Sequence, residues 1–278
     1  MNTIEATALL ATGSFAAGML GALTGLGGGL IIVPLLTLGF GVDLRYAIGA
    51  SLVSVIATSS GAAAAYVREG YTNVRVGMLL EIGTTVGAVI GAYIAGFVPT
   101  NAIAIIFALV LLFTAYRSIR PHPSASVALP PDPLAGRLRL DSTYPTPEGP
   151  KAYQVHNVPA GVTLMTIAGA LSGLLGIGSG VIKVLAMDQT MRLPFKVSTT
   201  TSNFMIGVTA AASAGVYLHR GYIAPGIVLP VMLGVLAGAM LGARTLTKTN
   251  TGLLRNLFTG VVVVLALEML YKGIRGSI

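Results

Sequence analysis

The sequence predicts an all-α, polytopic helical membrane protein made of two homologous repeats. Three observations lead to this prediction. Charged residues are 9% of the 278 residues and hydrophobic residues 54%, whereas a soluble domain has about 25% charged residues. Several apolar stretches are long enough to cross a bilayer, which takes about 20 residues. Finally, the second half of the chain repeats the first at a constant offset.

The repeat has an offset of 151 positions and joins residues 27–119 to residues 178–270. A motif just upstream, residues 21–26, matches residues 169–174 at an offset of 148, which predicts extra residues in the second copy. Duplicated hydrophobic halves are typical of transporters. At the main offset, Ser51, Thr58, Tyr66, Gly70, Tyr71, Gly83, Gly87, Gly91 and Phe107 fall on Ser202, Thr209, Tyr217, Gly221, Tyr222, Gly234, Gly238, Gly242 and Phe258.

The spans follow from the apolar stretches in chain order. The alternating ten-residue pattern of a membrane barrel is absent, so we expect helices. The first apolar run has no basic residue before it, so we expect it to stay as a helix rather than be cleaved. A further apolar piece, residues 30–40, is too short for a regular crossing. The expected helices are residues 4–26, 46–67, 76–98, 101–116, 158–175, 197–218, 222–243 and 253–271.

A hydrophilic linker separates the two copies. We assign repeat 1 to residues 1–119, the linker to 120–158 and repeat 2 to 159–278. The linker's many prolines argue against a helix across it. Alternation over residues 137–140, a turn over 145–150 and a returning strand at 152–155 predict a small hairpin. By the positive-inside rule the linker is cytoplasmic, because it carries or adjoins Arg117, Arg120, Arg137, Arg139 and Lys151.

The relative orientation of the copies depends on the short piece at residues 30–40. If it crosses, each copy has five segments and the copies are inverted; if it is re-entrant, each has four and they are parallel. The charges do not separate the two cases. We favour inversion because it creates a central two-fold site, as transporters commonly have. Inversion places Arg244, Lys248 and Arg255 inside but His219, Arg220, Lys272 and Arg275 outside.

Each copy has a glycine cluster that should break its first helical region. The clusters are residues 25–29 and 176–180. Glycine frees the backbone and permits close approach of a ligand, and a restarting helix offers unpaired N–H groups to an oxyanion. The alternative is close helix packing, which is our interpretation of the ladders starting at Gly83 and Gly234. The candidate binding residues are Gly27, Gly28, Gly29, Gly178, Ser179 and Gly180.

Polar residues inside the spans predict an uncharged, hydrogen-bonding lining. Ser51 and Thr58 are seven residues apart and share a helix face, and the repeat reproduces both. The alternative is that these hydroxyls bond their own backbone or a neighbouring helix. The candidate lining residues are Ser51, Thr58, Thr201, Ser202, Asn203 and Thr209.

Two ionisable residues break the repeat within apolar surroundings. Lys183 replaces Ile32 of the first copy, and Glu81 is replaced by Met232 in the second. Intramembrane charges are costly and often functional. Lys183 is therefore a candidate partner for an anion, and Glu81 a candidate for proton coupling. The alternatives are that Lys183 snorkels to the interface and that Glu81 lies near a helix end.

Several function classes are disfavoured. The chain has no cysteine, which excludes disulfides, thiolate metal sites and a covalent sulfur relay. The net charge of +8 is explained by membrane topology, so no nucleic-acid partner is expected. No metal or cofactor is expected either. Gly25 and Gly27 lack the third glycine of a nucleotide loop. A serine hydrolase using Ser179 and His219 lacks the nucleophile elbow, and a passive anion channel remains an alternative.

The glycine clusters, the helix starts Gly-Ala-Ser-Leu (49–52) and Thr-Thr-Ser-Asn (200–203), and residues 203–213 together resemble the TauE/SafE sulfite exporter family, also called the toluene sulfonate uptake permeases. The resemblance implies an inner-membrane permease for sulfite or for sulfonates such as sulfoacetate or taurine-related anions. Such a permease is compatible with a homo-oligomer. Ser179 and Leu185 depart from the family pattern. Outward movement of an anion from a negative interior gains about 2.3 kcal/mol per 100 mV, so export requires no ATP site.

Overall fold

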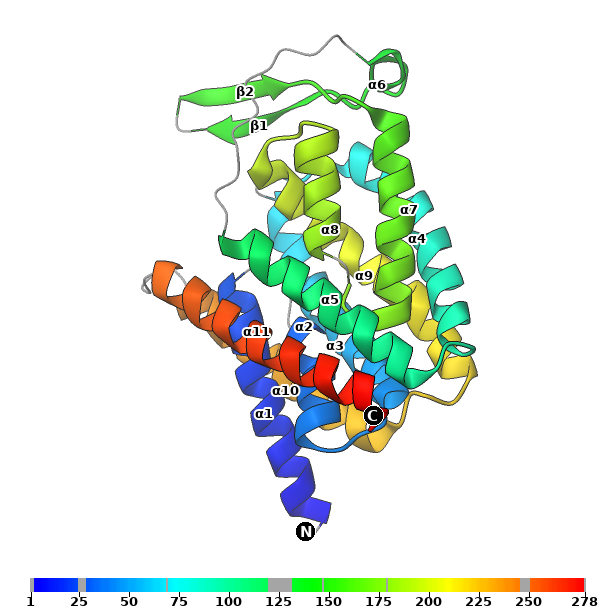
Figure 1. The fold of residues 1–278 in the computed structure, drawn as a ribbon. Helices are drawn as coiled ribbons and strands as arrows, with labels where there is room; N and C mark the ends of the chain where they lie inside the picture. Colours follow the sequence, from blue (N-terminus) through cyan, green and yellow to red (C-terminus); the bar gives the residue numbers. More distant parts are fainter. Residues whose placement is uncertain are drawn as a thin grey trace.

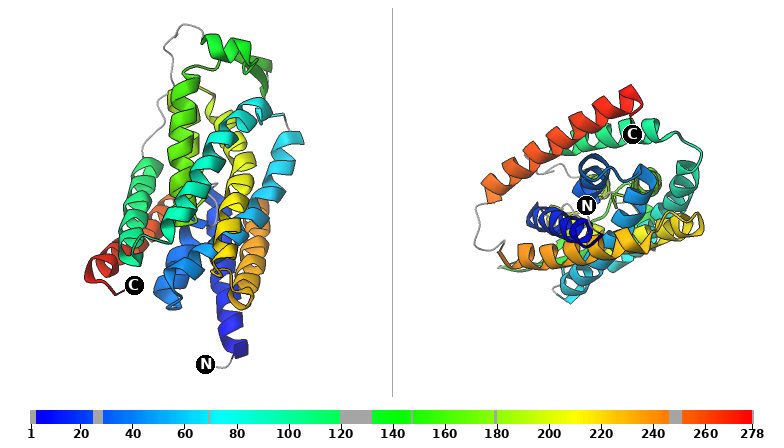
Figure 2. Two further views of the ribbon diagram at one scale, coloured as in Figure 1. Left: turned by 90° about the vertical axis from the view of Figure 1, so that its right-hand side faces the viewer. Right: turned by 90° about the horizontal axis from the view of Figure 1, so that it is seen from below.

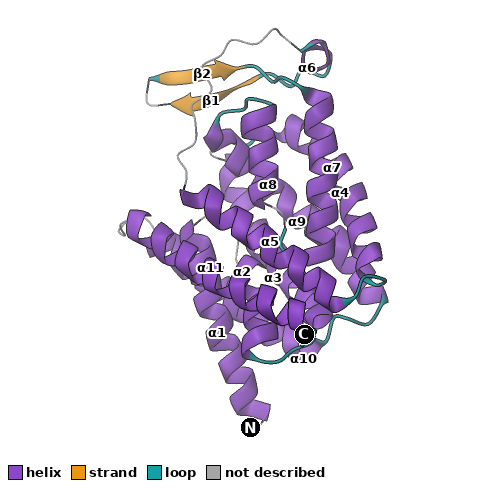
Figure 3. Ribbon diagram, viewed as in Figure 1, coloured by secondary structure: helices purple, strands orange, loops and turns teal. Residues whose placement is uncertain are grey.

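The computed structural model describes residues 3–24, 29–68, 70–119, 132–146, 148–178, 180–245 and 251–277. It is an elongated helical bundle with a small hairpin at one end (Figures 1 and 3). The first half contains α1 (Thr3–Thr24), α2 (Gly29–Pro34), the π-helical η1 (Leu35–Gly39), α3 (Leu44–Arg68), α4 (Val74–Ala95) and α5 (Thr100–Ile119). The second contains α7 (Val158–Leu175), α8 (Gly180–Leu185), the π-helical η2 (Ala186–Thr190), α9 (Phe195–His219), α10 (Pro225–Thr245) and α11 (Thr251–Arg275). The all-α prediction is confirmed.

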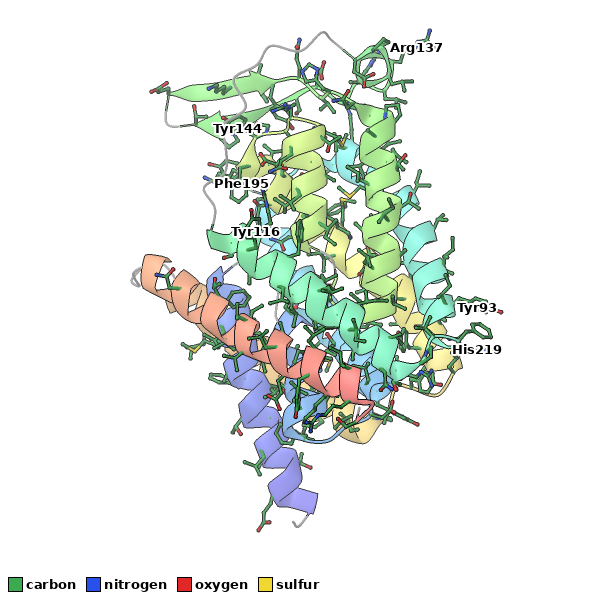
Figure 4. All side chains as sticks on the ribbon, in the orientation of Figure 1. Tyr93, Tyr116, Arg137, Tyr144, Phe195 and His219 are labelled. Atoms are coloured by element: carbon green, nitrogen blue, oxygen red, sulfur yellow. The ribbon has the colours of Figure 1, made fainter. Side chains whose placement is uncertain are left out.

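The outer surface is apolar, as a bilayer requires. Met78, Ile82 and Val86 on α4 are between half and two-thirds exposed, and such a stripe is suited to lipid rather than to water. Exposed Tyr93 and Tyr116 lie near the C-terminal ends of α4 and α5 (Figure 4), and tyrosine is enriched at membrane interfaces. Within the described residues, four helices are long and apolar enough to cross a membrane: Val74–Ala95, Thr100–Ser118, Val158–Leu175 and Pro225–Gly242. The protein is a multi-pass membrane protein.

The two halves have the same succession of elements. The bounds of α2, η1 and α3 recur 151 positions later as those of α8, η2 and α9. The turns that follow α3 and α9 also agree, because Gly70 and Gly221 have φ of 75° and 76°. Glycine adopts this left-handed conformation without the penalty that a Cβ brings. The sequence offset of 151 is therefore also an offset in local structure.

Each half packs its first helix against the fourth helix of the other half. A Cβ added to Gly87 on α4 would overlap the carbonyl oxygen of Thr166 on α7, and one on Gly238 of α10 would overlap that of Phe15 on α1. These two contacts are related by the offset of 151. Further cross-half pairs include α3 with α9 and α5 with α11, which lie side by side in Figure 2, and α4 with α9 and α3 with α10. The glycine ladders are thus helix-packing sites.

The same packing corrects the proposed offset of 148. Gly18 on α1 faces Val235, and Gly169 on α7 faces Thr84. These pairs are 151 positions apart, so Gly169 corresponds to Gly18 and not to Gly21. The expected extra residues before the second glycine cluster are not needed. A shift of three residues is nearly one helical turn, so the motif reappears on almost the same helix face and misleads a sequence comparison.

Each half opens with an antiparallel helical hairpin. Gly13 on α1 lies against Leu35 and Phe40, so η1 returns toward the end from which α1 starts. In the second half, the backbone N–H of His156 donates to Met191 O at 3.0 Å, which brings the end of η2 back to the start of α7. We call these the first and second hairpins. α1 and α7 enter the molecule from opposite ends (Figure 1).

The linker and the C-terminal end of α11 also lie at opposite ends. Gly273 and Gly276 contact Asn101 at the start of α5, whereas the linker caps the other end of the bundle (Figure 1). An inverted arrangement requires this placement, and the inversion itself stays a prediction. The side of the membrane on which each end lies stays a prediction.

The linker folds into α6 (Pro133–Arg137) and an antiparallel hairpin of β1 (Ser142–Thr146) and β2 (Gly149–Tyr153). The strand predicted at residues 137–140 is wrong, because Arg137 ends α6, which Pro133 starts as proline suits the first helical position, and a turn follows it. The hairpin itself is confirmed, although its strands are shifted. Asn73 anchors it: its Nδ2 donates to Leu140 O at 2.9 Å and to the Tyr153 hydroxyl at 2.8 Å.

Candidate functional site

The tip of the second hairpin is tied to a helix of the first half. Ser51 on α3 donates from Oγ to Gly176 O at 2.7 Å and is 3.4 Å from Gly29 O. Its counterpart Ser202 on α9 donates to Gly180 O at 3.3 Å. Ser51 is fully buried and Ser202 1% exposed. Both predicted lining serines therefore lie at the hairpin tips in the interior, where α3 and α9 cross.

The second hairpin requires glycine at its tip for two separate reasons. Gly176 and Gly178 have φ of 70° and 68°, a conformation that favours glycine. A Cβ on Gly178 would also lie 3.0 Å from the Ile206 side chain, and one on Gly180 2.9 Å from it. The chain breaks its helix here, between Leu175 and Gly180. Of the predicted tip residues, Gly27, Gly28 and Ser179 lie outside the described residues.

Lys183 and Glu81 are brought together through one hydroxyl. Lys183 Nζ, on α8, is 2.5 Å from Thr209 Oγ1 on α9. The same oxygen is 2.7 Å from Glu81 Oε1 on α4. Lys183 is fully buried and Glu81 9% exposed. Three elements from both halves thus meet in a chain of two short polar contacts, which we call the Lys183–Thr209–Glu81 relay.

Hydrogen counting fixes the direction of these bonds for the charged forms. An ammonium group only donates and a carboxylate only accepts. Thr209 therefore accepts from Lys183 and uses its single hydrogen toward Glu81, which is closer than the alternative acceptor, Met205 O at 3.0 Å. Thr85 also donates to Glu81 Oε1, at 3.2 Å. Among the described residues Glu81 Oε2 has no hydrogen-bond partner.

The other predicted residues are not part of the relay. Thr58 Oγ1 bonds Ser54 O and Val55 O of its own helix. Thr201 Oγ1 accepts from the backbone N–H of Asn73 at 3.0 Å, near the linker. Asn203 is half-buried on α9. These positions lie on the same helices as the buried site without joining it.

Sequence reasoning missed two polar residues. Thr85 follows Glu81 by four residues, and that spacing on a predicted helix could have identified it as a partner. Asn73 precedes the first residue of α4 and accepts from Val76 N–H at 3.1 Å. Asparagine directly before an apolar helix is a capping signal, but its bonds to the linker are tertiary and leave no sequence pattern.

Comparison with known proteins identifies the family. The family described as "Sulfite exporter TauE/SafE" matches residues 10–269. The chain belongs to the TauE/SafE family. It is similar to the probable membrane transporter protein YunE of Bacillus subtilis, at 26% identity over 93% of this chain and 95% of the relative. YdhB of the same organism, also named a probable membrane transporter protein, is 25% identical over 83% and 86%. No solved structure matches.

The family assignment agrees with the architecture. The two relatives above carry transporter names, and the chain covers nearly all of YunE. The Lys183–Thr209–Glu81 relay and the two hairpin tips are therefore features of a membrane transporter and not of an enzyme.

Proposed function

We propose that this TauE/SafE transporter carries small sulfur-containing oxyanions, sulfite or sulfonates such as sulfoacetate or taurine-related anions. The observation that supports this most is Lys183, a fully buried cation three residues from the start of α8 at the hairpin tip. A charge in a membrane interior is costly and often functional. A site that keeps one there is suited to a substrate of opposite charge.

Neutral donors near the tips suit an oxyanion. Ser51 and Ser202 supply hydroxyls at the two tips, and Thr209 supplies one beside Lys183. Each hydroxyl donates one hydrogen and can exchange its present acceptor for a substrate oxygen. Sulfite and sulfonate groups present three oxygens, so a cation with several hydroxyl donors matches their hydrogen-bonding capacity.

We propose export across the inner membrane, with the linker in the cytoplasm. A negative interior drives a monovalent anion outward by about 2.3 kcal/mol per 100 mV, which needs no further energy source. Glu81 is the candidate for proton coupling, because it is the carboxylate within the buried relay and its Oε2 is unpaired among the described residues. Glu81→Gln should then abolish proton movement that accompanies anion flux.

Ligand-dependent stabilisation of purified protein tests the substrate class. Sulfite or sulfoacetate at 100 times its dissociation constant should stabilise the folded protein by about 2.7 kcal/mol. Lys183→Met should remove this response, because it deletes the cation while keeping an apolar side chain of similar length. Stabilisation by neutral or cationic solutes, with none by these anions, would refute the proposal.

A further inference from the structure

We propose that the Lys183–Thr209–Glu81 relay is a latch that holds the linker-side half of the transport pathway closed, and that a substrate anion opens it by replacing Glu81 as the partner of Lys183. The inference rests on the proposed anion site. The latch specifies which contact changes when the anion binds, and that the pathway then opens at the linker end.

The latch lies between the hairpin tip and the linker. α4 starts at Val74, beside the Asn73 contacts to the linker, and Glu81 lies seven residues further, about 10 Å along the helix axis. Lys183 is on the arm that returns from the tip at Gly180 to the linker end, where Met191 O bonds His156. The relay therefore crosses the route from the tips to the linker.

The latch joins three elements through side-chain hydrogen bonds. Lys183 belongs to the second hairpin, Thr209 to α9 and Glu81 to α4, so separating any two of the three breaks the relay. The repeat-related positions are Ile32 and Thr58 in the first half and Met232 in the second. Thr58 bonds only carbonyl oxygens of its own helix among the described contacts. The polar closure is thus specific to the linker side.

An anion can open such a closure because it competes with Glu81. A ligand shifts a conformational equilibrium only through different affinities for the two states. In the latched state Lys183 already has a carboxylate partner through Thr209. In the open state it lacks that partner, so an anion binds the open state better. The same cation then supplies both affinity and the coupling of binding to opening.

Single-cysteine labelling tests the latch directly, because the natural chain contains no cysteine. Ile206→Cys is the reporter: Ile206 is 7% exposed and contacts the tip glycines Gly178 and Gly180. A charged, membrane-impermeant maleimide is applied to vesicles in which the linker faces the reagent, as shown by protease cleavage of the linker. Labelling rates then measure opening toward the linker.

Without ligand, Glu81→Gln and Thr209→Val should each raise the labelling rate about tenfold, because the first removes the carboxylate charge that strengthens the hydrogen bond and the second removes the bridging hydroxyl. Both replacements nearly preserve side-chain shape, and gel-filtration profiles will identify a misfolded variant. Thr84→Val is the matched control. Thr84 is fully buried one turn from Glu81, and its hydroxyl bonds Leu80 O and Glu81 O of its own helix.

Sulfoacetate, which does not consume maleimide as sulfite does, should accelerate labelling of the otherwise unaltered reporter protein but not of its Lys183→Met form. Labelling of Glu81→Gln and Thr209→Val at the parent rate, or an equal rise in Thr84→Val, would overturn the latch. So would an equal response of the Lys183→Met form to sulfoacetate. Opening of both latch variants, with no binding of any sulfur oxyanion, would support the latch and overturn only the substrate class.

Discussion

The Ser51 hydroxyl lies 2.7 Å from the carbonyl oxygen of Gly176, so one hydrogen bond joins a helix of the first half to the hairpin tip of the second. The bond is buried, and Gly176 has a left-handed backbone that ends α7. Gly29 O of the first hairpin is 3.4 Å from the same hydroxyl. Ser51 is thus the point at which both broken helical regions meet one side chain.

Ser51→Ala should lower anion transport and stability together. The substitution leaves the buried Gly176 carbonyl without this donor, which costs about 1–3 kcal/mol. We expect kcat/KM for anion flux to fall about fivefold or more, along with the thermal midpoint. Ser14→Ala is the control, because Ser14 is fully buried and its hydroxyl has no partner within the described part of the chain. Equal effects of the two substitutions would contradict a role for the Ser51 bond.

Gly87→Ala should destabilise the packing of α4 against α7. The added Cβ overlaps backbone atoms of Thr166, which cannot rotate away, and overpacking of this kind costs about 1–3 kcal/mol. Gly215→Ala is the matched control, because no atom lies within 4 Å of the Cβ it would add. In that helix interior alanine should be neutral or stabilising by up to about 1 kcal/mol. Thermal unfolding in detergent measures both, and an unchanged midpoint for Gly87→Ala would refute this packing.

The linker cap should weaken in acid through Asp132. Its carboxylate accepts from Val158 N–H and Leu134 N–H, both at 2.8 Å, and the bond from Val158 lowers the pKa of Asp132 below its ordinary value. A lowered folded-state pKa means that the stabilisation is present above the unfolded pKa and lost as the pH falls through the folded one.

Hydrogen exchange at the Leu134 and Val158 amides measures this effect. At pH 7, Asp132→Ala should speed their exchange about fivefold relative to the natural protein, as expected for a cap worth about 1 kcal/mol. Compared at the same acidic pH, below the lowered pKa, the two proteins should converge. A ratio that does not change with pH would show that the carboxylate charge is irrelevant.

The linker and the C-terminus should lie on opposite sides of the membrane. They occupy opposite ends of the molecule (Figure 1), and the arginines of the linker favour the cytoplasm. A reporter that is active only in the cytoplasm should therefore be active when inserted in the linker and inactive when fused after residue 278. Activity at both positions would refute the inverted orientation.

The spans were predictable because bilayer thickness and apolarity set them. The helix expected at residues 158–175 agrees with α7 in both bounds, and the other expected spans differ from the observed helices by a few residues at each end. The second hairpin arm was not predicted as an element, because Lys183 and Asp188 interrupt its apolar pattern. Its helicity depends on packing against α7 and α9, which a local pattern does not contain.

The residues of the site could be predicted from the sequence, but the hydrogen bonds between them could not. Lys183 and Glu81 were identified because the repeat-related positions carry apolar residues. Thr209 was identified because the repeat-related position carries the same residue. Nothing in the sequence indicated that the Thr209 hydroxyl would join them, since the three residues come from helices far apart in the chain. Thr201 and Thr58 are also threonines within apolar helices, as Thr209 is. However, Thr201 accepts a bond from the turn between α3 and α4, and Thr58 bonds its own helix.

Anion flux in proteoliposomes tests the central claim most directly. The natural protein should move labelled sulfite or sulfoacetate with saturable kinetics, and a neutral solute of similar size should not cross. Lys183→Met should reduce the anion flux at least about tenfold, the factor that corresponds to losing about 1.4 kcal/mol of anion stabilisation. Transport of a neutral or cationic solute, with no movement of sulfite or any sulfonate, would contradict the account.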